Sequence, residues 1–96
     1  MNNAEYKQPV NPFHPGVILL EEFLEPAGIS QAAFSRTVGW TKSRLNELIK
    51  GKRGITAEAA LDLAKVLNTS PRFWMNLQTT YDLARASSSS SARRRS

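Results

Sequence analysis

The sequence contains no cysteine and only one histidine, and both shortages exclude classes of function. Without cysteine there is no disulfide framework and no thiolate metal site, and the reducing cytoplasm is the expected compartment. One histidine leaves little basis for a Ser-His-Asp set, and no glycine-rich phosphate loop precedes a helix. We therefore expect neither an enzyme nor a bound cofactor or metal, and we interpret His14 as a helix cap or packing residue.

The sequence also lacks a long apolar run and any strong strand pattern. No stretch is long and apolar enough to span a bilayer, and the N-terminus shows no basic-then-apolar signal pattern, which predicts a soluble cytoplasmic protein with no membrane partner. Its 96 residues, 41% of them hydrophobic, suffice for one small core. The fold class that we predict is all-α, with five helices.

Positive charge is concentrated in one segment of the chain. Residues 1–29 carry a net charge of −3, residues 30–53 hold six Lys or Arg and one Glu for a net charge of +5, residues 54–86 are neutral, and residues 87–96 add +3. A uniformly solvated surface would not gather charge in this way. Segment 30–53 is therefore the predicted contact site for an anionic partner.

Segment 30–53 begins with the pattern of a short helix that ends in a tight turn. Ser30 is a favoured N-cap, because its hydroxyl can accept from an unpaired N–H of the first turn. Phe34 and Val38 follow four residues apart, as one face of a helix requires. Gly39 then ends the helix, because a residue without a Cβ adopts the left-handed conformation easily.

The second helix of this segment carries groups suited to reading DNA. Thr41 can cap it, and its inward apolar stripe is formed by Leu45, Leu48 and Ile49. The other faces hold donors and acceptors for base edges, and Gly51 stops the helix before a Lys52-Arg53 pair suited to phosphates. This layout is typical of a DNA-reading helix-turn-helix, while the plainer interpretation is a structural helical hairpin with a basic rim.

The side chains of this segment divide into two expected roles. The residues predicted to read base edges are Lys42, Ser43, Arg44, Asn46 and Glu47. The residues predicted to contact phosphates are Gln31, Thr41, Lys50, Lys52 and Arg53. Arg44 is suited to a bidentate contact with guanine and Asn46 to one with adenine, each worth about 1–3 kcal/mol of discrimination. Glu47 has two interpretations: it accepts from cytosine, or it pairs with Lys50 or Arg44 on the helix surface.

The rest of the chain divides into an arm, a domain and a tail. Residues 1–13 are predicted to be extended or disordered. Residues 14–86 form the predicted helix-turn-helix DNA-binding domain. Residues 87–96 are a Ser/Arg tail of low complexity with nothing to bury, and we expect them to be disordered.

Three further helices complete this domain. The first begins around Pro15 and ends near Gly28, with an inward stripe of Val17, Leu20 and Leu24. The fourth is capped by Thr56, and its predicted stripe consists of Ala60, Leu61, Ala64 and Leu67. The fifth opens with Ser70 as cap and Pro71 in the first turn. Its apolar residues predict either core packing or a dimer interface.

Three stretches together resemble a known family. They are HPGVILLEEFLEPAGIS, SQAAFSRTVG and RLNELIKGKRGITAEAALDLAKVLNTSPRFWMNLQTTYDL, which run from about His14 to Leu83. The chain resembles the HigA/VapI-type antitoxins of the xenobiotic-response-element, lambda-repressor-like helix-turn-helix superfamily. The SQ…G pattern alone is shared by many repressors, whereas the combination with the flanking HPG and FWMNLQTTYDL segments is specific.

The resemblance implies a homodimeric repressor that binds a palindromic operator before its own operon and neutralises a HigB-type toxin, a small ribosome-dependent ribonuclease. It places Gln31 on a phosphate and Ser43, Arg44 and Asn46 at the major groove. It also implies that the fifth helix, at the C-terminal end of the domain of residues 14–86, is a dimerisation helix that pairs two subunits. The expected dimer-interface residues are Phe73, Trp74, Leu77 and Tyr81.

The chain departs from the family pattern at a few positions of the reading segment. Lys50 stands where many relatives have Asn, Ser35 where the superfamily often has Ala, and Trp40 where the turn usually has a smaller apolar residue. Ser35 keeps the small size that the fold needs. Lys50 and Trp40 bear on which operator sequence is read.

Two alternatives to the antitoxin interpretation remain at this stage. One is a stand-alone regulator of the same superfamily that has no toxin partner. The other is a basic RNA-binding module, although RNA readers usually expose stacking aromatics on a sheet or loop and this sequence predicts none there. The neighbouring reading frame would distinguish an antitoxin from a plain repressor.

Overall fold

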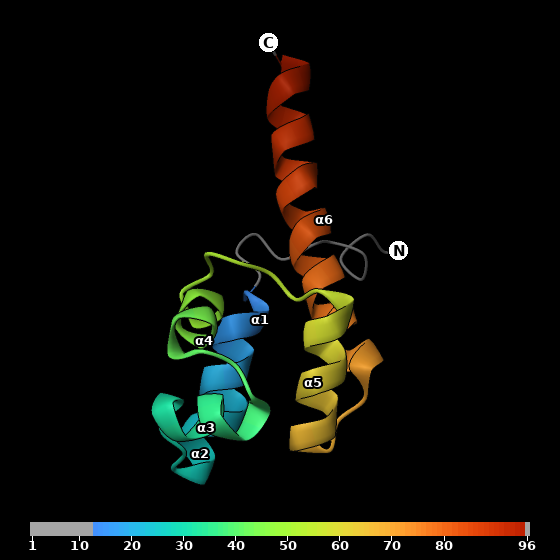
Figure 1. The fold of residues 1–96 in the computed structure, drawn as a ribbon. Coiled ribbons are helices and arrows are strands. Elements are labelled where there is room, and N and C mark those ends of the chain that lie inside the picture. Colours follow the sequence, from blue (N-terminus) through green and yellow to red (C-terminus); the bar gives the residue numbers. More distant parts are fainter. Residues whose placement is uncertain (1–12, 96) are drawn as a thin grey trace.

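The computed structural model describes the backbone of residues 13–95 and the side chains of residues 13–87. Within that range every regular element is helical, which confirms the all-α prediction (Figure 1). The elements are α1 (Pro15–Ile18), η2 (Leu19–Leu24), α2 (Glu25–Ala27), α3 (Gln31–Val38), α4 (Lys42–Ile49), α5 (Ala57–Leu67) and α6 (Pro71–Arg95). Because α1, η2 and α2 follow one another directly, the described chain has the five predicted helices.

The first of these helices contains a wide π-helical turn, η2, just before a proline. Pro26 has no N–H to donate and its ring excludes the carbonyl that a regular α-helix would place beside it. At the N-terminal end, His14 Nδ1 accepts from the Gly16 N–H at 3.0 Å, and Pro15 occupies the first turn. Gly28 ends the helix in the left-handed conformation, with φ of +67°.

The π-helical turn changes which side chains of this helix face the core. Leu19 and Leu24 are fully buried, while Leu20 is only partly buried and packs against the core from its edge. The predicted stripe of Val17, Leu20 and Leu24 is therefore wrong in omitting Leu19. Its regular spacing presupposes an α-helix, whereas the wider turn places residues five apart on one face.

The remaining helix starts are capped as predicted. The hydroxyl oxygens of four residues each accept from the backbone N–H three positions later, at 3.0–3.1 Å. These caps are Ser30, Thr41, Thr56 and Ser70. Gly39 ends α3 with φ of +79° and begins the turn into α4. These local choices fix where α3 and α4 begin and end.

The inward face of α5 differs from the predicted stripe. Leu63 and Ala60 are fully buried and Ala59 and Ala64 are nearly so, whereas Leu61 is 59% exposed. The prediction is therefore wrong for Leu61, because small alanines fit on either of two adjacent helix faces and leave the phase of the stripe ambiguous.

The helices form two groups that meet across one core. Figure 1 shows α1 to α4 on one side and α5 with the first turns of α6 on the other. The core includes Phe34, Trp40, Leu45, Leu63 and Trp74, which come from both groups. None of the described helices has the length and apolar character needed to cross a bilayer.

The two ends of the chain relate differently to the predicted tails. Residues 1–12 of the predicted arm lie outside the described residues. The backbone of α6 is helical through Ser87 and on to Arg95, beyond the boundary where we expect order to end, while the side chains from 88 onward lie outside the described part. The Ser/Arg tail therefore stays a prediction.

Candidate nucleic-acid interface

Helix α4 is held with its apolar face inward and its polar face outward. Leu45 and Leu48 are buried, and Ile49 is partly buried, as the sequence predicts. Lys42 and Ser43 on the first turn are exposed to solvent. A helix fixed in this way can present its N-terminal side chains to the major groove as a rigid body.

A glycine allows the first helix to approach α4 very closely. A Cβ on Gly16 would overlap the carbonyl oxygen of Leu48 and would lie 2.7 Å from its carbonyl carbon and 2.8 Å from the Ile49 Cα. All of these neighbours are backbone atoms, so no side-chain rotation could relieve the contact. Gly16 therefore fixes the position of α4, and we did not single it out from the sequence, although it lies within the HPG stretch.

Two predicted DNA-contacting amides lie together at the junction of α3 and α4. Asn46 Nδ2 donates to Gln31 Oε1 at 3.5 Å, and both side chains are half-buried. This contact brings the predicted phosphate residue of α3 beside a predicted base reader of α4. Thr41 lies between the two helices, where its hydroxyl oxygen accepts from the Arg44 N–H at 3.0 Å.

Glu47 and Arg53 form an ion pair. Arg53 Nη2 lies 2.7 Å from Glu47 Oε1, and Arg53 Nε also donates to that oxygen at 3.1 Å. The partner of Glu47 is thus Arg53, and the predicted pairing with Lys50 or Arg44 is wrong. The physical reason is the turn at Gly51, which brings the following loop back along the helix. The pair is exposed, so it contributes about 1 kcal/mol or less to stability.

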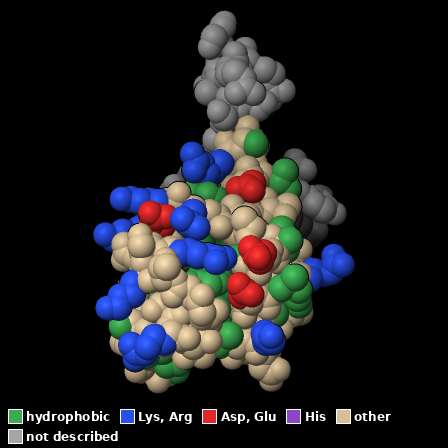
Figure 2. All heavy atoms as spheres, in the orientation of Figure 1, with side chains coloured by type: hydrophobic (Ala, Val, Ile, Leu, Met, Phe, Trp, Pro, Cys, Tyr) green, Lys and Arg blue, Asp and Glu red, His purple; other side chains and the backbone are tan. Residues whose placement is uncertain are grey.

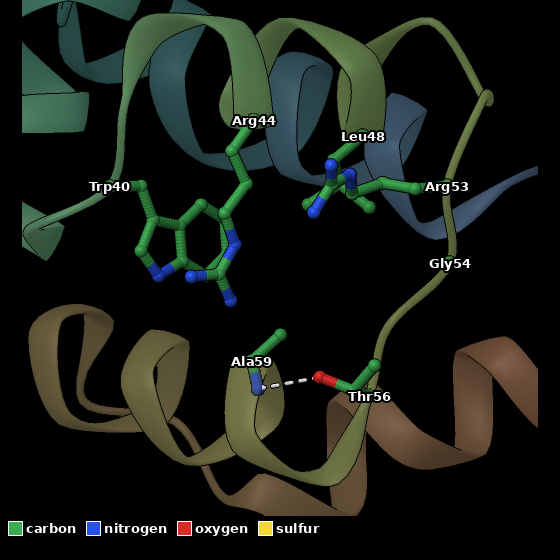
Figure 3. Close-up of a pocket in the computed structure, with 7 residues that line it drawn as sticks. All are labelled: Trp40, Arg44, Leu48, Arg53, Gly54, Thr56 and Ala59. Carbon is green, nitrogen blue, oxygen red and sulfur yellow. Dashed lines mark hydrogen bonds between the residues drawn. The ribbon is translucent and has the colours of Figure 1, made fainter.

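Arg44 has a different environment from Arg53. Its guanidinium carbon lies 4.2 Å from the centroid of the Trp40 ring, a cation–π distance. Trp40 is 7% exposed, and its indole N–H donates to Asp62 Oδ2 of α5 at 2.9 Å. Figure 3 shows Arg44 lying across this ring between α4 and α5. Arg44 and Arg53 both line a pocket of about 150 Å³ between these helices.

The loop after α4 is tied to α6. The Ile55 N–H donates to Gln78 Oε1 at 2.6 Å, and Gln78 Nε2 donates in turn to Asp82 Oδ1 at 2.9 Å. Lys50 and Lys52 stay exposed on this loop, and the Lys52 N–H donates to the Glu47 carbonyl oxygen at 2.8 Å. Gln78 and Asp62 are positioning residues that the sequence did not reveal, because their partners are more than twenty positions away.

His14 lies beneath the same loop. The His14 ring packs edge-on against the Tyr81 ring of α6, with 4.8 Å between the ring centroids, and His14 is buried. Burial lowers the pKa of His14 below its ordinary value of 6.5; Asp82 and a hydrogen bond with the Arg53 backbone act in the opposite direction. A neutral ring fits its role, because Nδ1 must accept from Gly16. Within the described part of the chain, no group of three potential metal-ligating side chains occurs.

The charged side chains gather over these elements. On the face shown in Figure 2, most Lys and Arg side chains lie over the left part, where Figure 1 draws α3, α4 and the loop that follows. Asp and Glu side chains on this face lie mainly toward α5 and α6. This part of the molecule is built from segment 30–53, which contributes α3, α4 and the following loop and carries six Lys or Arg.

The four residues expected at a dimer interface have different environments. Trp74 is fully buried and its indole N–H donates to Thr69 Oγ1 at 2.7 Å. Since a second subunit could not touch it, we reassign Trp74 from the interface to the core. Phe73 is 37% exposed, and Leu77 and Tyr81 are half-buried.

Comparison with known proteins identifies the family of the chain. A family model described as Helix-turn-helix matches residues 20–74, which include α3 and α4. Virulence-associated protein I of Dichelobacter nodosus is 44% identical over 73 residues, which are 76% of this chain and 68% of that protein. Antitoxin HigA-1 of Vibrio cholerae is 39% identical over 72 residues, covering 75% of this chain and 68% of that protein.

A solved structure gives the same result for the fold. The structure described as Pseudomonas aeruginosa antitoxin HigA with higBA promoter has 40% sequence identity and a TM-score of 0.81, covering 85% of this chain and 89% of that chain. The match therefore includes the helix-turn-helix and the helices that support it. The chain belongs to the helix-turn-helix family and, within it, to the HigA/VapI type.

Proposed function

We propose that this chain is a repressor that binds double-stranded DNA sequence-specifically and acts as the antitoxin of a HigB/HigA-type operon. The observation that carries the proposal is the placement of α4: its apolar face is buried while Lys42 and Ser43 are exposed beside a basic loop. The similar antitoxin HigA of Pseudomonas aeruginosa, solved with higBA promoter, supports it.

In this proposal the side chains of α4 read bases and those around it hold phosphates. Lys42, Ser43 and Arg44 face the major groove, with Asn46 and Glu47 further along the helix. Phosphates are held by Gln31, Thr41, Lys50, Lys52 and Arg53. The Glu47–Arg53 ion pair is exposed, so DNA phosphates can compete with Glu47 for Arg53. When Arg53 binds a phosphate, the Glu47 carboxylate becomes available to accept from a base.

A homodimer on a palindromic operator completes the proposal. Two copies of α4 about 34 Å apart would read two half-sites one helical turn apart. The partly exposed Phe73, Leu77 and Tyr81 make α6 the proposed contact between subunits. Analytical ultracentrifugation of the chain tests the dimer, and a monomer at micromolar concentration contradicts it.

DNA binding is tested with two alanine variants of different expected behaviour. Arg44→Ala should weaken binding to the DNA upstream of the gene and relax preference at one base pair. Lys52→Ala should weaken binding to all sequences alike and reduce the salt dependence. Lys65→Ala, an exposed charge on α5, is the control for loss of one positive charge. Equal losses on specific and random DNA for Arg44→Ala contradict base reading.

The toxin partner is tested by coexpression with the neighbouring reading frame. An antitoxin should co-purify with a small ribonuclease encoded beside it, and should relieve the growth arrest that this protein causes. If no such protein binds while operator binding persists, the chain acts as a stand-alone regulator of the same family. If the full chain binds no operator DNA, both the antitoxin and the stand-alone regulator proposals are overturned.

A further inference from the structure

The two arginines of the pocket between α4 and α5 differ in what occupies their donors. Arg53 is engaged by Glu47 through two nitrogens. Within residues 13–87, the guanidinium of Arg44 makes no hydrogen bond or ion pair, and its contact is the face of Trp40 (Figure 3). Stacking uses the face of a guanidinium, and its N–H groups point outward in the same plane. Arg44 is thus held while its donors stay free.

The Trp40 ring is itself fixed from two directions. It follows the left-handed Gly39, and its backbone N–H donates to the Ser35 carbonyl oxygen at 2.9 Å. The indole N–H donates to Asp62 Oδ2 at 2.9 Å, which ties the ring to α5. With 7% of its surface exposed, the ring has little room to move. The turn and α5 therefore hold one flat surface at a defined place beside α4.

We propose that Trp40 and Asp62 are specificity-determining positioning residues, which set the plane of the Arg44 guanidinium for bidentate contact with a guanine. The inference rests on the proposed function and adds residues that do not themselves touch DNA. A bidentate contact needs both the plane and the direction of the guanidinium to match the base edge. Fixing the plane before binding reduces the side-chain freedom that is lost when the correct base is bound.

The test compares base preference among variants, using a library of random-sequence DNA duplexes as the probe. Arg44→Ala first identifies the base pair whose preference depends on Arg44. Trp40→Leu keeps a buried apolar side chain but has no ring, and it should lower preference at that same pair roughly tenfold. Asp62→Ala should have a smaller effect in the same place, while Asp62→Asn keeps an acceptor for the indole N–H and should restore the preference.

Two further variants distinguish the positioning role of Trp40 from a merely structural one: a double variant and a substitution of a second buried tryptophan. Trp40→Leu combined with Arg44→Ala should lose no more preference than Arg44→Ala alone, because both act on one contact. Trp74→Phe also changes a buried tryptophan whose indole N–H is hydrogen-bonded, but far along the chain on α6. It should lower thermal stability and leave base preference unchanged.

The outcomes separate this inference from the proposed function. If the wild-type chain selects no sequence from the library, the proposed function fails. If it selects a site and Trp40→Leu and Asp62→Ala keep full preference at the Arg44 base pair, the positioning role is overturned. Tighter and equally selective binding by Trp40→Leu would also overturn the positioning role, because the Trp40 ring would then be keeping Arg44 away from DNA. If Trp40→Leu fails to fold, the base preference of Asp62→Ala at the Arg44 base pair decides whether the positioning role holds.

Discussion

Helices α3 and α4 differ from helices α5 and α6 in how they are held. The first pair and its following loop expose charged and polar side chains, and only a few of their residues, such as Phe34, Leu45 and Leu48, are fully buried. The second pair buries Leu63 and Trp74 and supplies much of the core. A helix that must face a ligand cannot also bury all of its faces, so its position has to be set by neighbours.

The second pair supplies those neighbours through three side chains. Asp62 accepts from Trp40, Gln78 accepts from Ile55, and Tyr81 packs on His14. Each of these contacts ends on the turn, the loop or the helix start that surrounds α4. The polar surface is thus positioned by residues that lie behind it, and variants of the two regions should behave differently.

The largest effect is expected from Trp74→Ala. Removing a fully buried tryptophan leaves a cavity and should cost about 3–5 kcal/mol, which lowers the melting temperature by roughly 15 °C or more. Circular dichroism during heating measures this loss. Phe73→Ala, at the neighbouring and partly exposed position, should cost less. A Trp74→Ala variant that melts like the wild type and only dissociates into monomers would return Trp74 to the dimer interface.

The next effect concerns Gly16 of α1, where the first helix meets α4 through backbone atoms. Gly16→Ala would place a methyl group onto the Leu48 carbonyl and should cost about 3 kcal/mol in urea unfolding. Because α4 would be displaced, binding to the preferred DNA should fall even under conditions where the variant is folded. Gly28→Asn is the control, since nothing lies within 4 Å of that position and Asn tolerates its conformation. Wild-type DNA affinity in Gly16→Ala would contradict the close approach.

The sequence predicted best what is decided locally. Ser30, Gly39 and Thr41 mark the ends of α3 and the start of α4 through hydrogen bonds within four residues, and each is where it was expected. The burial of Leu45 and Leu48 also follows from helical spacing. Such features need no knowledge of the other helices.

The rest depends on contacts between distant segments. The π-helical turn before Pro26 shifts burial toward Leu19, and only the complete core selects that shift. The contact of Trp40 with Asp62 spans 22 positions, and that of Ile55 with Gln78 spans 23. A surface pairing such as Glu47 with Arg53 depends on the path of the loop. Spacing alone cannot rank these partners, because several donors lie within reach of each acceptor.

A smaller effect is expected from Gln78→Ala. The Ile55 N–H would lose its acceptor in a buried position, which should cost about 1–2 kcal/mol and loosen the loop that carries Lys52. Fluorescence anisotropy should show weaker binding to preferred and random DNA alike. Asp82→Ala removes the hydrogen bond between Gln78 Nε2 and Asp82 but leaves Gln78 Oε1 as the acceptor of the Ile55 N–H, and it serves as the control. A change of base preference without a general loss would show that Gln78 does not act through the loop.

The smallest effect is expected from a change of pH. It tests the contact at His14 between the start of the first helix and the loop after α4. Burial lowers the pKa of His14 in the folded chain, so the unfolded chain binds more protons between the two pKa values. The stabilisation is therefore present above pH 6.5 and is lost as the pH falls through that value toward the folded pKa. A proton on Nδ1 would also remove the acceptor of the Gly16 N–H beside α4.

Because the chain has a single histidine, one substitution isolates this titration. His14→Asn keeps an oxygen that can accept from Gly16 but does not titrate near neutral pH. Urea unfolding between pH 7.5 and 5, a range set around the ordinary histidine pKa, should show decreasing stability for the wild type and a flatter profile for His14→Asn. If the free energy of unfolding of the two proteins changes equally with pH, stability does not depend on the proton on His14. If the DNA affinity of the wild type falls more steeply with acid than that of His14→Asn, the proton on His14 also affects DNA binding, as expected for a ring that contacts the backbone of Gly16 and of Arg53 in the basic loop.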